Sequence, residues 1–188
     1  MELVSRAIYF ATKAHDGMRR KNSEVPYIMH PLEAAVIVST MTDDQEVIAA
    51  AILHDVVEDT DITIEEVYSE FGERVGLLVA SETENKREDL PSNLTWKIRK
   101  EESLIDLKNA KDVNILKVWF GDKLANMRSF YEDYKVNGDK MWVKFNQTNP
   151  SEHAWYYRSI AEYTSALKDY RAWQEYNELV KIVFGKGE

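Results

Sequence analysis

The sequence predicts an all-α fold in a single domain. Apolar residues recur at helical spacing along most of the chain, and polar capping patterns precede several of these stretches. No pair of segments shows the apolar–polar alternation that predicts neighbouring strands. The length of 188 residues and the 44% hydrophobic content are enough to bury one core, and 7 Gly and 4 Pro fit a globular chain.

The first third of the chain predicts three helices and one basic loop. The loop covers 18–31 and contains three consecutive cations, and Pro31 suits the first position of a second helix that runs to about Thr40. The segment 42–45 has the pattern of a capping box that would open a central helix. The first helix ends near Gly17 and is predicted from a stripe of apolar residues: Leu3, Ala7, Ile8, Ala11 and Ala14.

Helices also account for the rest of the chain. The segment 63–66 is a second capping box, and Gly72 is placed to close the helix that it opens. Asp112 can cap a long helix that passes Phe130. A polar loop is predicted over 81–93. The remaining predicted helices cover 75–80, 94–108, 139–145, 151–170 and a last segment to Val183.

Composition argues against several classes of function. The chain has no cysteine, which excludes a disulfide framework and a thiolate metal site. A net charge of -9 argues against general nucleic-acid binding. No apolar run approaches the roughly 18 residues of a membrane span, and the first residues do not resemble a signal peptide. We therefore expect a cytoplasmic protein without a membrane or nucleic-acid partner.

The stretch 49–60 joins a buried-looking helix to five polar groups. His54 and Glu58 are four residues apart, and so are Asp55 and Asp59, so each pair would share one face of a helix. An imidazole beside a carboxylate suits a divalent transition metal. A helix that ends in solvated acids gives the same pattern, so a functional interpretation needs support from elsewhere in the chain.

Three further features bear on chemistry, and each has a structural alternative. His30 precedes a helix-starting proline and could instead be a cap or a packed residue. Asp122 follows an apolar run and needs a partner, which could be a cation such as Arg128, because unpaired buried charge is costly. Asn126 lies one helical turn after Asp122. The cations of 19–21 precede His30 and could bind phosphate, although most charge runs are solvated surface.

At these positions the chain resembles a known family. The order of His30, His54-Asp55 and Asp122 is similar to the H…HD…D pattern of the HD phosphohydrolase superfamily. The RelA/SpoT alarmone hydrolase branch has similar segments around these residues: RK ahead of PYIMHP at 20–31, LHDVVEDT at 53–60 and GDKLANMR at 121–128. The resemblance covers about 7–128, is weaker over 155–157, and implies a small hydrolase without synthetase or regulatory domains.

The resemblance implies a role for each matching position. One divalent metal ion, by family habit Mn²⁺, would be held by His30, His54, Asp55 and Asp122. The attacking water and the scissile pyrophosphate group would be handled by Glu58 and Asp59. Contacts to a nucleotide substrate would come from Arg20, Lys21, Asn126 and Tyr156. Two departures from the family pattern are Asn22-Ser23 in place of a glycine-containing turn and Gly121 in place of the common alanine.

The function implied by the resemblance is metal-dependent hydrolysis of the 3′-pyrophosphate of the alarmones ppGpp and pppGpp, releasing pyrophosphate and GDP or GTP. The implied fold is a single HD-type helical bundle over 1–188, with its motif core at about 7–128 and C-terminal helices within 151–183. Two other classes stay open. One is an HD phosphohydrolase acting on ppApp, NADPH or another nucleotide, and the other is a non-catalytic nucleotide-binding module. The sequence fixes neither the base, nor the metal, nor the oligomeric state.

Overall fold

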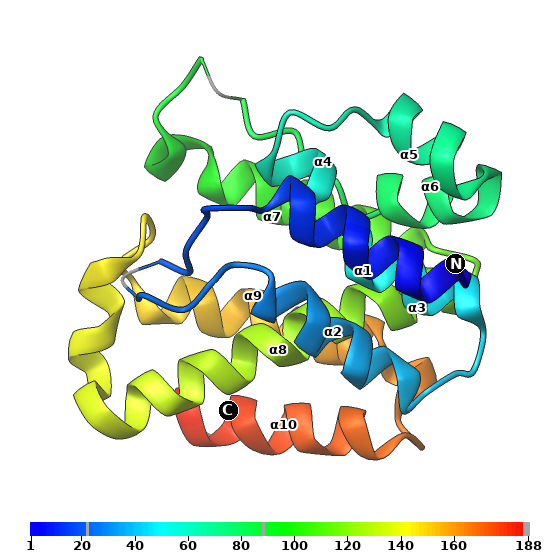
Figure 1. The fold of residues 1–188 in the computed structure, drawn as a ribbon. Coiled ribbons are helices and arrows are strands. Elements are labelled where there is room, and N and C mark those ends of the chain that lie inside the picture. The colour runs from blue at the N-terminus through cyan, green and yellow to red at the C-terminus, as the bar shows by residue number, and fades with distance from the viewer. Residues whose placement is uncertain (22, 88, 186–188) are drawn as a thin grey trace. The chain divides into compact units, whose positions relative to one another are not determined.

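The structure is a computed structural model that describes residues 1–21, 23–87 and 89–185. Over these residues it contains helices and no β-strand, which confirms the predicted all-α fold (Figure 1). The chain divides into two compact units, each made from two stretches of sequence. Unit 1 comprises Met1–Thr83 and Asp112–Ala125, and unit 2 comprises Glu84–Lys111 and the chain from Asn126 onward.

Unit 1 is organised around one short helix, α3, whose second half (49–53) is buried. Three other helices, α1, α2 and α6, pack against it, and α5 packs on α6. The alanines at 49–51 are fully buried, and their small side chains let the surrounding helices approach closely. The helices of this unit before α8 are α1 (Leu3–Ala14), α2 (Met29–Ser39), α3 (Gln45–Leu53), α4 (Val56–Asp59), α5 (Ile64–Phe71) and α6 (Glu73–Ala80).

The caps of the helices in unit 1 match the sequence prediction in one case and differ in another. Thr63 and Glu66 form the reciprocal capping box predicted for α5, and Gly72 ends that helix with a positive φ of 90°. The cap of α3 is Asp44, whose carboxylate accepts from the backbone N–H of Glu46, so the capping box predicted from 42–45 is wrong.

The predicted helix through 49–60 is interrupted at its two most polar residues. Helix α3 ends at Leu53, and α4 begins at Val56, so His54 and Asp55 form a turn between them. The His54 ring donates a hydrogen bond from Nδ1 to the carbonyl oxygen of Ala51, 2.8 Å away. This carbonyl would ordinarily accept the fourth following backbone N–H, so the side chain competes with the helical ladder.

The long helix α8 (Val113–Asn137) contributes its first half to unit 1. Gly121 lies against α2: a Cβ at this position would come within 2.8 Å of the Ala34 carbonyl oxygen and 2.6 Å of Val38 Cγ2. The family's common alanine would not fit here without a shift of backbone. The glycine thus permits a close crossing of α2 and α8, and the next residue along α8 is Asp122.

Unit 2 has an aromatic core between its helices. Its elements are α7 (Ser92–Asn109), the second half of α8, the 3₁₀ segment η1 (Gly138–Lys144), α9 (Pro150–Tyr163), η2 (Ser165–Leu167) and α10 (Arg171–Phe184). Helix α9 packs against α7 and α10. The helix predicted over 151–170 ends early, at Tyr163, and the stretch predicted at 139–145 is largely 3₁₀.

None of the described helices is both long enough and apolar enough to span a bilayer.

Candidate metal centre and catalytic site

His54 is held so that only one of its ring nitrogens can bind a metal. The residue is 3% exposed. A carbonyl oxygen can only accept, so Nδ1 carries the hydrogen that bonds Ala51, and Nε2 faces the other way. Nε2 is buried and makes no hydrogen bond with any described residue. A metal ligand usually has this arrangement, in which the second nitrogen fixes the tautomer and the ring orientation.

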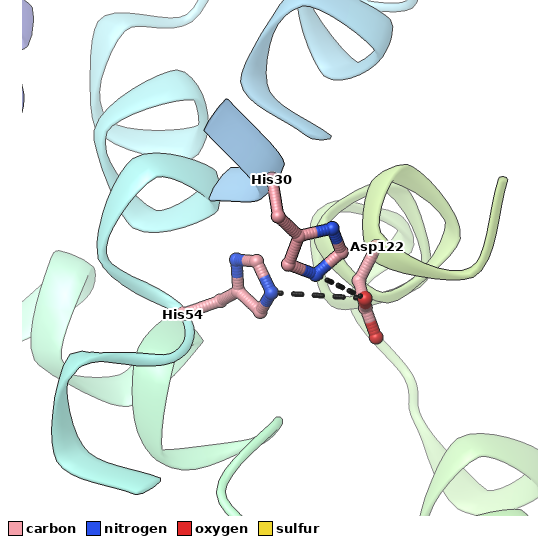
Figure 2. A group of neighbouring side chains, drawn as sticks. All are labelled: His30, His54 and Asp122. Carbon is pink, nitrogen blue, oxygen red and sulfur yellow. Dashed lines mark ion pairs between the residues drawn. The ribbon is translucent and has the colours of Figure 1, made fainter. Parts of the chain in front are cut away.

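Two helices bring side chains to the nitrogen Nε2 of His54, which itself lies in the turn after α3. His30 lies in the first turn of α2, and Asp122 lies midway along α8. His30 Nε2 is 3.0 Å and His54 Nε2 is 3.8 Å from Asp122 Oδ1 (Figure 2). The possible ligand atoms of these three buried residues all lie within 4.8 Å of one another. Residues that are far apart in sequence thus converge on one point.

Asp55, the fourth ligand predicted from the sequence, lies beside the two histidines but outside the group of three residues whose ligand atoms all lie within 4.8 Å of one another. Its Oδ2 lies 3.1 Å from His54 Nε2 and 3.4 Å from His30 Nε2. Ligand atoms about 2.1 Å from a divalent ion lie roughly 3.0 to 3.4 Å apart across an octahedral or tetrahedral edge. Three of the four nitrogen–oxygen distances fall in this range. Two neutral imidazoles and two carboxylates would also balance the charge of a divalent ion, so the residues present fit such an ion.

The electrostatics of the cluster agree with this fit. Burial lowers the pKa of His54, but the charges of Asp55 and Asp122 outweigh it and raise that pKa to about 10. Burial raises the pKa of Asp55, but His54 and His30 hold it below its usual value. Burial also opposes the ionisation of Asp122, yet Lys123 and His30 keep its pKa well below the usual range. Positive charge is therefore favoured where a cation would bind.

Asp122 has a lysine partner as well as its histidines. Lys123 donates a hydrogen bond to Asp122 Oδ2, the carboxylate oxygen that is not closest to the histidines. The cation of Arg128, considered from sequence as a partner for Asp122, forms a two-pronged pair with Glu175 at 2.6 Å and 2.9 Å. Asp122 therefore fits both the salt-bridge interpretation and the metal-ligand interpretation of the sequence. Its Oδ2 pairs with Lys123, and its Oδ1 faces the two histidines.

The two predicted catalytic carboxylates lie in the short helix α4. Asp59 donates its backbone N–H to the Asp55 carbonyl oxygen at 2.9 Å, so it stays one turn from Asp55 despite the interruption at 54–55. Its Oδ2 accepts a hydrogen bond from the Tyr27 hydroxyl at 2.5 Å. Glu58 precedes Asp59 in α4, four residues after His54, and is partly exposed. The Tyr27 hydroxyl thus lies within hydrogen-bond distance of both Asp59 and the proposed ligand Asp55.

The predicted substrate residues fall into two groups. Arg20 is half-buried, with its guanidinium carbon 5.7 Å from the centre of the Tyr27 ring, and Lys21 is exposed in the same loop. The neighbouring Asn22 lies outside the described residues. Asn126 and Tyr156 belong to unit 2. Tyr156 is 2% exposed, with the Lys100 ammonium 5.1 Å from its ring centre.

The structure adds two residues to which sequence reasoning gave no role. Tyr27 was part of a matching motif, but only the fold shows that its hydroxyl reaches Asp55 and Asp59. The sequence predicts Glu82 in a polar loop, yet it is 7% exposed, and its Oε1 has no hydrogen-bond partner among the described residues. Burial raises the pKa of Glu82 to about 8, partly opposed by Lys123. No local sequence pattern marks this glutamate as buried.

A comparison with known proteins identifies the family. The model of the family described as "HD domain" matches residues 7–142, which include all four proposed ligands. The chain belongs to the HD-domain family. HD-domain membership and the grouping of His30, His54 and Asp122 together support a site for a divalent metal ion.

The curated relatives of this HD-domain chain support the resemblance to the RelA/SpoT branch. A Synechocystis protein named probable guanosine-3′,5′-bis(diphosphate) 3′-pyrophosphohydrolase is 39% identical over 127 residues, which cover 68% of this chain and 16% of the relative. The Aquifex aeolicus protein of the same name, without "probable", is 37% identical over 130 residues, covering 69% and 18%. This HD-domain chain thus spans less than a fifth of the length of either relative.

Solved structures confirm the HD-type fold. A crystal structure of a Listeria monocytogenes protein matches with a TM-score of 0.73 and 30% identity, covering 84% of this chain and 99% of that one. A metazoan SpoT orthologue, described as hydrolysing ppGpp, matches with a TM-score of 0.79 over 99% of this chain and 98% of its own. At 24% identity the second match bears on the fold alone.

Proposed function

We propose that this HD-domain protein hydrolyses the 3′-pyrophosphate of a guanosine alarmone, ppGpp or pppGpp, and releases pyrophosphate with GDP or GTP. The observation that carries the proposal is the convergence of His30, His54, Asp55 and Asp122 with a further carboxylate, Asp59, one turn away. Relatives named as 3′-pyrophosphohydrolases of this alarmone support the choice of substrate. The working unit is residues 1–188, and the partner is a small nucleotide.

The metal centre supplies the electrophilic part of the chemistry in this proposal. A divalent ion held by the four ligands, Mn²⁺ by preference, would lower the pKa of a water molecule and stabilise charge that develops on phosphate oxygens. His54 can bind it only through Nε2, because Nδ1 is committed to Ala51. The charges of Asp55 and Asp122 raise the pKa of His54, so a metal that binds at Nε2 would displace a proton.

The side chains of α4 and of the loop before α2 then have separate tasks. Glu58 takes a proton from the attacking water, and Asp59 orients that water. The water oxygen forms a new bond to the phosphorus while the phosphorus–oxygen bond to the nucleotide 3′ oxygen breaks, and the leaving oxygen takes a proton from solvent to become the 3′ hydroxyl. Arg20 and Lys21 offset the negative charge of the phosphates, which the chain's net charge of -9 would otherwise repel. Asn126 and Tyr156 contact the nucleoside.

The deciding experiment is a substrate panel. The purified chain is incubated with Mn²⁺ and each of ppGpp, pppGpp, ppApp, NADPH and a nucleoside monophosphate, and the products are identified by mass. Release of pyrophosphate and GDP or GTP is the expected result. Turnover of only another nucleotide would move the chain to a different HD phosphohydrolase activity. Tight binding of a nucleotide without any product would indicate a non-catalytic binding module.

A further inference from the structure

The Tyr27 hydroxyl lies between two carboxylates that the proposed function uses differently. Its oxygen is 2.7 Å from Asp55 Oδ2 and 2.5 Å from Asp59 Oδ2. Two backbone hydrogen bonds hold this tyrosine in place: its own N–H donates to the Met18 carbonyl at 3.0 Å, and its carbonyl accepts from the His30 N–H at 2.9 Å. The hydroxyl is therefore positioned by the same loop that positions a proposed ligand.

The oxygen of Asp55 that meets Tyr27 is also the one that faces the histidines. Oδ2 accepts from Tyr27 and lies 3.1 Å from His54 Nε2. A phenol has one hydrogen and can donate it fully to only one carboxylate at a time. When positive charge engages Asp55 Oδ2, this oxygen becomes the weaker acceptor, and the Tyr27 hydrogen is drawn to Asp59.

The Tyr27 ring contacts the side chains of His15 and Arg20. The His15 ring lies 4.9 Å away with a 38° tilt, and the Arg20 guanidinium carbon lies 5.7 Å from the Tyr27 ring centre. His15 is 2% exposed, and neither of its ring nitrogens makes a hydrogen bond to any described residue. This buried ring therefore packs against Tyr27. One side chain thus contacts a proposed metal ligand, a proposed catalytic carboxylate and a proposed substrate cation.

We propose that Tyr27 is a positioning residue that couples occupancy of the metal site to the orientation of the Asp59 carboxylate. A hydrogen bond at Oδ2 fixes the plane of this carboxylate and hence the direction in which Oδ1 points. The hydrogen bond from the Tyr27 hydroxyl to Asp55 holds Asp55 toward the histidines in the absence of metal. The catalytic half of this inference rests on the proposed function, whereas the metal half depends only on the ligand geometry.

The first test measures Mn²⁺ affinity, by titration calorimetry or by competition with a chelator. Tyr27→Phe removes the hydroxyl and keeps the ring, and it should weaken Mn²⁺ binding about tenfold, the lower end for loss of a group that orients a ligand. Tyr176→Phe is the matched control, because this buried tyrosine hydroxyl donates to the Tyr157 carbonyl at 2.9 Å. It should leave the Mn²⁺ affinity at the wild-type value.

The second test separates turnover from substrate affinity at saturating Mn²⁺. Tyr27→Phe should lower kcat about tenfold with KM unchanged, because the phenyl ring still supports Arg20. Tyr27→Leu should lower kcat and also raise KM. Combined with Asp59→Asn, Tyr27→Phe should add little further loss of kcat if it acts through Asp59.

The outcomes separate this inference from the proposed function. Wild-type Mn²⁺ affinity in a folded Tyr27→Phe variant would overturn the coupling, and so would full additivity with Asp59→Asn. If the wild-type chain binds Mn²⁺ but releases no pyrophosphate from any nucleotide in the panel, the proposed function fails. The Mn²⁺ titration alone then decides whether Tyr27 holds Asp55. Thermal unfolding of each variant shows whether the tested chains are folded.

Discussion

Two buried histidines, one in each unit, each hydrogen-bond a backbone carbonyl through one ring nitrogen. The groups around the rest of the ring differ between them. His54 donates to the Ala51 carbonyl at 2.8 Å, and His153 bonds the Gln147 carbonyl through Nε2 at the same distance. The second nitrogen of His54 faces two carboxylates. The ring of His153 is stacked on Trp142, with ring centres 4.9 Å apart and planes within 27°.

The surroundings give the two imidazoles opposite properties. Burial lowers the pKa of His153, and no nearby carboxylate outweighs it, whereas Asp55 and Asp122 raise the pKa of His54 to about 10. Burial and one hydrogen bond therefore do not distinguish a ligand from a core residue. The distinction lies in the surroundings of the ring, which are the carboxylates of Asp55 and Asp122 for His54 and the aromatic rings of Trp142 and Trp96 for His153.

The largest expected effect comes from removing a metal ligand, which disrupts the metal centre and leaves the aromatic core of unit 2 intact. His54→Ala should lower Mn²⁺ affinity at least about a hundredfold and reduce turnover to background, because it removes one of four ligands. Asp122→Ala should do the same. His153→Ala should instead destabilise the fold, by about 2 kcal/mol or more, and leave the metal content of the folded protein unchanged.

Elemental analysis of the three purified variants, with circular dichroism as a check of folding, separates these effects. Full metal occupancy in His54→Ala and Asp122→Ala would remove both residues from the ligand set. Loss of metal in a folded His153→Ala variant would mean that the two histidines are less distinct than the contacts indicate.

The comparison also shows how much of the site the sequence could predict. The four ligands were inferred from the family pattern, since helical spacing alone left His30 and Asp122 with structural alternatives. The capping box at Thr63 was predictable because all of its contacts are local. The turn at 54–55 was not predictable, because the His54 side chain bonds the Ala51 carbonyl there, and helical spacing does not indicate this hydrogen bond.

Long-range contacts were out of reach for the same reason. Tyr27 reaches Asp59 across 32 positions of sequence, and no periodicity encodes such a pairing. Gly121, which departs from the family pattern, marks the close approach of α2 to α8. The need for glycine there is explained only by the structure, in which the Ala34 backbone lies against it. Patterns that repeat within a helix were therefore read correctly more often than contacts between helices.

The next largest effect concerns the acid–base group. Glu58→Gln should keep the metal and lower kcat about a hundredfold, because the amide preserves shape but cannot accept the proton. The measurement is steady-state pyrophosphate release at saturating Mn²⁺, with Glu65→Gln on α5 as a control outside the site. Wild-type turnover in Glu58→Gln would pass the role to Asp59.

The loop cations should differ from each other. Arg20→Ala should lower kcat/KM for a 3′-pyrophosphorylated nucleotide about thirtyfold, close to 2 kcal/mol, without loss of metal. Lys21→Ala should have a smaller effect, because Lys21 is exposed and Arg20 packs on the Tyr27 ring. The kcat/KM for a small chromogenic phosphodiester should change little in either variant. Equal kinetics on the nucleotide for all three proteins would show that these cations are solvated surface.

The smallest effect concerns Glu82, a buried carboxyl group of unit 1. Burial raises its folded-state pKa to about 8 from an ordinary value of 4.5. A raised carboxyl pKa means that the folded chain holds a proton that the unfolded chain has released. This contribution to stability is therefore complete below about pH 4.5 and is lost progressively as the pH rises to about 8.

Comparison with Glu82→Gln isolates this contribution, because the amide keeps the volume and has no proton to lose. In metal-free protein the two chains should be equally stable near pH 4.5, and the wild type should become less stable relative to the variant above it. Between pH 6 and 7 the difference in unfolding free energy should grow by about 1 kcal/mol. Urea unfolding at a series of pH values measures it. A difference that stays constant with pH would mean that Glu82 is ionised in the folded chain, with Lys123 compensating its charge in place of a bound proton.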